Sequence, residues 1–137
     1  MGIFSQLEVN FDREIVEDFV FHYALMCKNM KPLIVGLLHP ENYRKNMGEL
    51  AHIFHNIKSA AGFLHLEPLM YLSHVCEEVV EQARMSQTYA SKALVDWLVV
   101  ASEQFECYRR DIGKDAADFT GLNPSIIQRE FDSLECV

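Results

Sequence analysis

One histidine, His55, stands among small residues in the middle of a strongly helical stretch. At about 100° per residue, the apolar residues of this stretch fall on the side opposite the histidine; they are Leu50, Ile53, Ile57, Ala60 and Leu64. The side that carries the histidine collects small residues and flanking polar ones, namely Gly48, Ala51, His52, Lys58, Ser59 and Gly62. A glycine inside a helix costs about 1 kcal/mol relative to alanine. We therefore expect a docking face, made of Gly48, Ala51, His52, Ser59 and Gly62, on which a large partner approaches the imidazole.

Two chemical interpretations compete for this histidine. In the first, His55 is a nucleophile for phosphoryl groups and Lys58 is its electrostatic partner, because residues three apart are neighbours on a helix surface. An ammonium group there can bond the oxygens of a phosphorylated imidazole. In the second, the helix is an ordinary amphipathic one whose surface includes a histidine. The combination of histidine, lysine one turn on and small residues after it favours the phosphoryl acceptor.

The run His55-Asn56-Ile57-Lys58-Ser59-Ala60-Ala61-Gly62 resembles the signature of histidine-containing phosphotransfer (HPt) domains. Within that family it is most similar to the phosphotransfer domain of the chemotaxis histidine kinases. The resemblance implies a helical bundle whose surface histidine carries a phosphoryl group between two-component signalling proteins. The family pattern has glycine where this chain has Ser59, and often glycine where it has His65. We expect Ser59 to preserve access, and His65 to alter the turn without altering the chemistry.

A predicted hairpin brings more polar residues to the level of His55. The turn is expected near residues 65–67, and Pro68 suits the first turn of the next helix. A hairpin folded about residue 65, or between residues 65 and 66, places His55 level with residue 75 or 76, flanked by His74 and Glu77. The resemblance implies the same pair, since the chemotaxis kinases carry a histidine and a glutamate at these offsets. By that resemblance, Glu77 accepts a hydrogen bond from Nδ1–H of His55 and leaves Nε2 as the nucleophile. In the alternative, both residues belong to a solvated helix face.

Two other functions fit a helical bundle with surface histidines. A His/Glu metal site would use His52, His55, His74 and Glu77. Against it, the histidines point away from the apolar side, Lys58 would repel a cation, and the chain lacks the two inward-facing Glu-x-x-His motifs of di-iron bundles. A non-catalytic adaptor bundle would need no accessible histidine. We expect no metal and no cofactor bound by this chain, with Mg²⁺ brought by the partner.

Length, charge and cysteine spacing restrict the class of protein. The 137 residues predict a single domain, 1–137, with a bundle core at about 10–113 and a tail at 114–137. The net charge of −8, without a basic patch, argues against nucleic-acid binding. Three of the four cysteines lie within helical apolar patterns, and none forms a CxxC pair, which predicts reduced thiols in a cytosolic protein. Glu8 and Asp12 interrupt any secretory signal, and the longest apolar run, residues 33–38, is too short to span a membrane.

The hydrophobic pattern predicts an all-α fold, an antiparallel four-helix bundle with an additional short N- or C-terminal helix. We expect a first helix from near Asn10 that Pro32 kinks or ends, and a break at His39-Pro40. The second helix should run from about residue 41 or 42 to 64, and the third from near Pro68 to about 85. The fourth helix should begin after a cap at Ser91 and stop at Gly113. A short helix at 124–131 should follow, and the apolar side chains of Phe131 and Leu134 could dock on the bundle or bind a partner.

The sequence therefore predicts a cytoplasmic, monomeric phosphocarrier that is free-standing, with no ATP-binding or hydrolytic machinery of its own. Its expected partners are a response-regulator receiver domain, a histidine kinase, or both, and neither nucleic acid nor a membrane.

Overall fold

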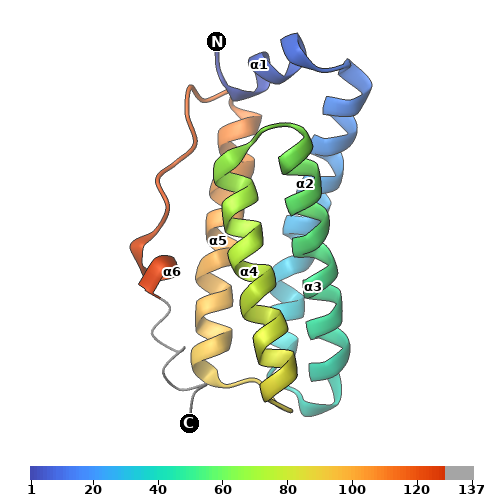
Figure 1. Ribbon diagram of the computed structural model, residues 1–137, viewed down its shortest axis with the longest axis vertical. Helices are drawn as coiled ribbons and strands as arrows, with labels where there is room; N and C mark the ends of the chain where they lie inside the picture. Colours follow the sequence, from blue (N-terminus) through green and yellow to red (C-terminus); the bar gives the residue numbers. More distant parts are fainter. Residues whose placement is uncertain (129–137) are drawn as a thin grey trace.

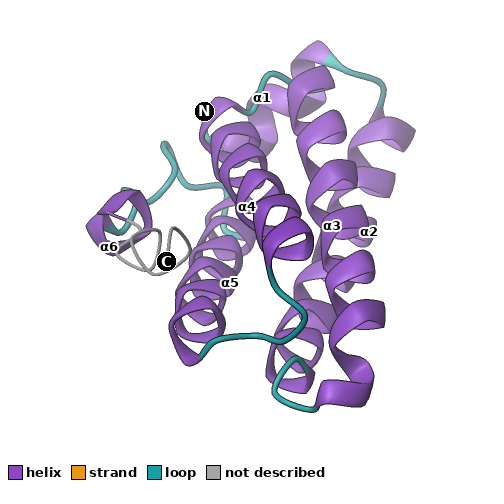
Figure 2. Cartoon of the chain, turned by 60° about the horizontal axis from the view of Figure 1, so that its bottom comes forward, coloured by secondary structure: helices purple, strands orange, loops and turns teal. Residues whose placement is uncertain are grey.

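The computed structural model describes residues 1–128 and is an all-α bundle, with no strand in that range. Four long helices form the bundle: α2 (Arg13–Gly36), α3 (Pro40–Phe63), α4 (Glu67–Ser86) and α5 (Lys92–Gly113). Short connections make successive helices antiparallel, and α5 returns to pack against α2 (Figures 1 and 2). Two short helices flank the bundle, α1 (Ile3–Asn10) and α6 (Pro124–Gln128). The expected extra helix therefore exists at both ends of the described chain.

The core consists of apolar side chains that recur at helical spacing on the four long helices. Phe54 of α3 stacks on Phe105 of α5, with ring centroids 5.7 Å apart, and both rings are fully buried. The hydroxyl of Tyr23 on α2 donates to the carbonyl of Phe105 at 2.6 Å, so its polar atom is satisfied inside the core. This packing buries one side of α3 and leaves the opposite side exposed.

Several helix ends agree with the sequence signals, and others differ. Pro40 occupies the first turn of α3, and Oγ of Ser91 accepts the backbone N–H of Leu94 at 3.1 Å at the start of α5. Asn10 was expected to begin the first long helix, but it ends α1, and α2 begins at Arg13.

Of the two outcomes expected at Pro32, a kink or an end, the end does not occur, because α2 continues to Gly36. Proline removes the hydrogen bond to the carbonyl four residues earlier, that of Lys28. Both residues are exposed on α2, so water can satisfy the freed carbonyl.

The tail after α5 crosses the outer surface of that helix. Three α5 side chains at heptad spacing hold it: Trp97 donates to the Ile126 carbonyl, Gln104 bonds Gly121 and Asn123, and Asp111 accepts from Thr120. The α6 helix lies on this side, outside the bundle (Figure 2). The remainder of the expected 124–131 helix, with Phe131, Leu134 and Cys136, lies outside the described residues.

The turn between α3 and α4 is a Schellman motif that a histidine closes. The N–H of Leu66 bonds the carbonyl of Ala61 at 2.8 Å, and that of His65 bonds Gly62 at 3.3 Å. His65 adopts a left-handed φ of 59°, a conformation that favours glycine. The motif sets where the chain reverses, and so fixes which residues of α4 face α3.

We expect His65→Gly to be more stable than His65→Ala by about 1 kcal/mol, because only the alanine carries the steric cost of a Cβ in the left-handed region. Both variants lack the imidazole, so the comparison isolates the backbone. Urea unfolding of the two proteins measures the difference. Equal midpoints and slopes would show that residue 65 does not take this conformation in solution.

Candidate functional site

His55 lies near the middle of α3 with its imidazole directed to solvent. The helix positions it by burying its other side, where Leu50, Ile57 and Leu64 pack into the core as predicted. The His55 side chain is 58% exposed, which leaves the ring open to a partner molecule.

Glu77 of α4 joins His55 and Lys58 into one network. Its Oε2 lies 2.8 Å from Nδ1 of His55, and its Oε1 accepts a hydrogen bond from Nζ of Lys58. Glu77 is only 19% exposed, because the two helices enclose it. Hairpin geometry predicted this approach, and the structure shows the contact.

The charges of this network determine which ring nitrogen is free. The hydrogen bond from Lys58 lowers the pKa of Glu77, and the bond from His55 and both positive charges act in the same direction, against the opposing effect of burial. Glu77 is therefore ionised at neutral pH and can only accept hydrogen bonds. Nδ1 of His55 must then carry the proton, and in the neutral ring Nε2 keeps an unprotonated lone pair.

The predicted docking face is only partly exposed. Ser59 and His52 are exposed, and Gly48 is half-buried with open space where a Cβ would lie. Ala51 was expected on this face, but it is buried. Gly62 is half-buried too. A Cβ at this position would lie 3.4 Å from Sδ of Met70 on α4. The small residue at 62 thus leaves room for the neighbouring helix.

His74 was expected in the same network as His55, and the structure places it elsewhere. Its Nε2 lies 3.3 Å from Oε1 of Glu78, one turn along α4. No hydrogen bond within residues 1–128 joins His74 to His55, Lys58 or Glu77. The exposed pair His74–Glu78 forms a separate surface contact.

The four residues of the metal alternative are likewise not gathered at one point. His52 lines a groove between α2 and α3, while His55 turns toward α4. Among the described residues, no three His, Cys, Asp or Glu side chains group as metal ligands would. In the same part of the chain, every helix is too short or too polar to cross a bilayer.

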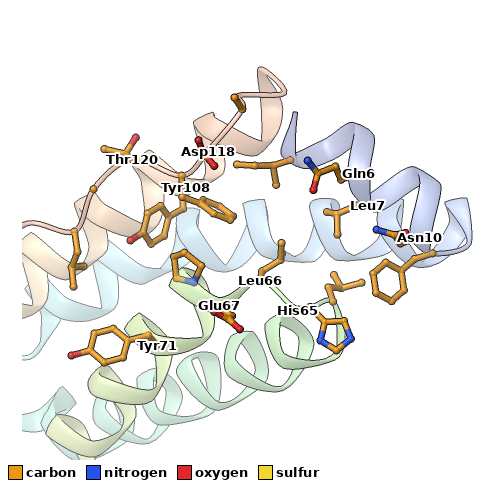
Figure 3. A pocket seen from close by; sticks show the side chains of 18 residues that line it. Gln6, Leu7, Asn10, His65, Leu66, Glu67, Tyr71, Tyr108, Asp118 and Thr120 are labelled. Carbon is orange, nitrogen blue, oxygen red and sulfur yellow. The ribbon is translucent and has the colours of Figure 1, made fainter. Parts of the chain in front are cut away.

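Two surface hollows lie away from the ring itself. The groove between α2 and α3, about 880 Å³, contains Arg44 and Lys45, which sequence reasoning did not single out. A second groove of about 750 Å³ lies at the α3–α4 turn, between α1 and the tail, and is lined by His65, Tyr71 and Tyr108 among others (Figure 3). His55 is ten residues from His65, or about 15 Å along the helix, so the second groove is not part of this site.

Replacing Glu77 with Gln should weaken the preference of the neutral His55 ring for the Nδ1–H tautomer. The amide keeps the shape of the side chain but lacks the negative charge that requires a donor at Nδ1. Ring ¹⁵N chemical shifts at alkaline pH measure the tautomer ratio. Glu78→Gln is the matched control, since it removes the partner of His74 on the same helix. If both variants change the His55 signals equally, the His55–Glu77 contact does not exist in solution.

Comparisons with known proteins give a distant relation. No family model matches the chain, and no solved structure matches it. The sensor histidine kinase CheAY of Helicobacter pylori is 27% identical over 84 residues, which cover 61% of this chain and 10% of the kinase. The chain therefore corresponds to a small part of that kinase, and it is a distant relative of a two-component kinase.

Proposed function

We propose that this chain is a histidine phosphotransfer protein of a two-component phosphorelay, and that His55 carries the phosphoryl group. The observation that carries the proposal is the hydrogen bond from Nδ1 of His55 to Glu77, which leaves an unprotonated Nε2 on an exposed ring. The distant relation to a sensor histidine kinase supports the same class. We further propose a cytoplasmic monomer whose partners are a receiver domain, a histidine kinase, or both.

In the proposed reaction, the lone pair of Nε2 attacks the phosphorus of the donor. The donor is an acyl phosphate on a receiver aspartate, or the γ-phosphate of ATP held by a kinase. As the N–P bond forms, the P–O bond to the leaving oxygen breaks, and that oxygen keeps the electron pair. The ring becomes positively charged while Nδ1 retains its proton, and the carboxylate of Glu77 stabilises this charge. The reverse sequence delivers the group to a receiver aspartate.

Lys58 has a second role in the proposal. Without phosphate it bonds Glu77, one turn from the ring. Its ammonium group can turn to the oxygens of a phosphoryl group on Nε2, where a charge-assisted hydrogen bond forms. Phosphoryl transfer depends mainly on positioning and charge neutralisation. The chain would supply the acceptor, the lysine and a docking surface, and the partner would bring Mg²⁺.

His55→Gln should abolish labelling by a radioactive phospho-donor kinase or receiver domain. Because the side chain is exposed, the free energy of unfolding should change by less than about 1 kcal/mol. The wild-type label should be acid-labile and alkali-stable. His74→Gln, which removes a histidine of similar exposure on α4, should keep full labelling. Label that persists in His55→Gln, or that disappears in His74→Gln, would refute the assignment.

Lys58→Ala should slow phosphoryl acceptance about tenfold, the size expected for one partly exposed hydrogen bond to a charged group. Circular dichroism should show an unchanged fold. Lys114→Ala, at an exposed cation just after α5, serves as the control. Stopped-flow or rapid-quench measurements give the transfer rates. Equal rates in wild type and Lys58→Ala would mean that Lys58 is only a solvated surface residue.

A further inference from the structure

The orientation of the His55 ring restricts the side from which a partner can reach it. Glu77 holds the Nδ1 edge of the ring toward α4. The Nε2 edge therefore faces away from α4, and α3 has α2 on its other flank (Figure 2). A phosphoryl group entering at Nε2 comes from the outside of α3 and from the α2 side.

The helix register shows which residues of α2 lie at this level. Nδ2 of Asn46 on α3 donates to the carbonyl of Leu33 on α2 at 3.1 Å. The helices are antiparallel, so nine residues forward from Asn46 to His55 correspond to nine residues back from Leu33, to residue 24. Leu25 is thus level with the phosphoryl acceptor.

Large apolar side chains are exposed on α2 at and beyond that level. Phe21 is 66% exposed and Leu25 is 45% exposed. Pro32 follows Leu25 by two turns on the same face and lines the 880 Å³ groove between α2 and α3. We call Phe21, Leu25 and Pro32 the α2 ridge. Together with the groove, it provides a surface of exposed apolar side chains, interrupted by the exposed Lys28, that runs along α2 at the level of His55.

Charges differ on the two flanks of His55. The groove on the α2 side contains Arg44, Lys45 and His52, with Glu49 as the one acidic residue of its lining. The exposed part of α4 carries Glu78, which pairs with His74, and Glu81, which pairs with Arg84, in a chain whose net charge is −8. A partner that brings Mg²⁺ binds it with carboxylates and so presents negative charge around its phosphoryl group. Such a partner is attracted to the groove, where Arg44 and Lys45 outnumber the single carboxylate of Glu49.

We propose that the receiver domain docks on the α2 ridge and the adjoining groove, not over α4. An apolar segment of the receiver would cover Phe21 and Leu25, while its acidic side chains face Arg44 and Lys45. This inference rests on the proposed phosphotransfer function and adds the direction of approach and the chemistry of the partner surface.

Kinetics with a receiver domain that labels His55 test the ridge. Phe21→Ser should raise the KM for the phosphorylated receiver about tenfold, as loss of one interface anchor does, while kcat changes less than about twofold because the reacting groups are untouched. Tyr89→Ser is the matched control, since Tyr89 is an aromatic residue that is also 66% exposed but lies in the α4–α5 loop. The control should leave KM unchanged.

Charge reversal tests the groove and the choice of flank. The double variant R44E/K45E should lower kcat/KM about tenfold at low ionic strength, and added salt should reduce the difference. Glu78→Lys on α4 should change kcat/KM less than about twofold. An unchanged KM in Phe21→Ser would overturn the docking surface, and so would a larger loss of kcat/KM in Glu78→Lys than in the double variant. In either case, labelling of His55 would still support the proposed function. If a histidine kinase labels wild-type His55 and no receiver domain exchanges the label, the docking proposal falls alone. If neither partner labels His55, both proposals fall.

Discussion

The hydrogen bond between Glu77 and Nδ1 of His55 is the interaction on which the arrangement of the site depends. It joins two helices, so it requires the correct register of the α3–α4 hairpin. The Schellman turn at His65 sets that register, and the half-buried Gly62 lets Met70 of α4 pack close to α3. A shift of one residue in the turn would rotate Glu77 away and leave the ring without a fixed tautomer.

Much of this arrangement could be predicted from the sequence, because helical periodicity and hairpin offsets are local properties. They indicated the exposed side of α3 and the approach of Glu77 to His55. The predictions that failed concern residues whose surroundings are set by the packing of other side chains. Ala51 lies at the border of the exposed side, where periodicity alone does not decide burial, and the structure buries it. His74 has two acidic residues within reach, and spacing alone does not choose Glu78.

Two details outside the site were not fixed by the sequence pattern. Helix α1 has eight residues, with Ile3 and Leu7 as its buried anchors, which is too little for a periodic pattern to stand out. Pro32 does not end α2, because its face of the helix is exposed and the freed carbonyl can be solvated. The same exposed face gives the α2 ridge, so Glu77 of α4, which orients the ring, and the proposed recognition surface on α2 would lie on opposite flanks of α3.

The most direct test of the account is the position of the phosphoryl group on the imidazole. Phosphorus–nitrogen NMR of the phosphorylated, ¹⁵N-histidine-labelled protein distinguishes the two ring nitrogens. Because Glu77 holds the proton on Nδ1, the account predicts phosphorus bonded to Nε2 of His55. Phosphorus on Nδ1 of His55, or on any other residue, would contradict it.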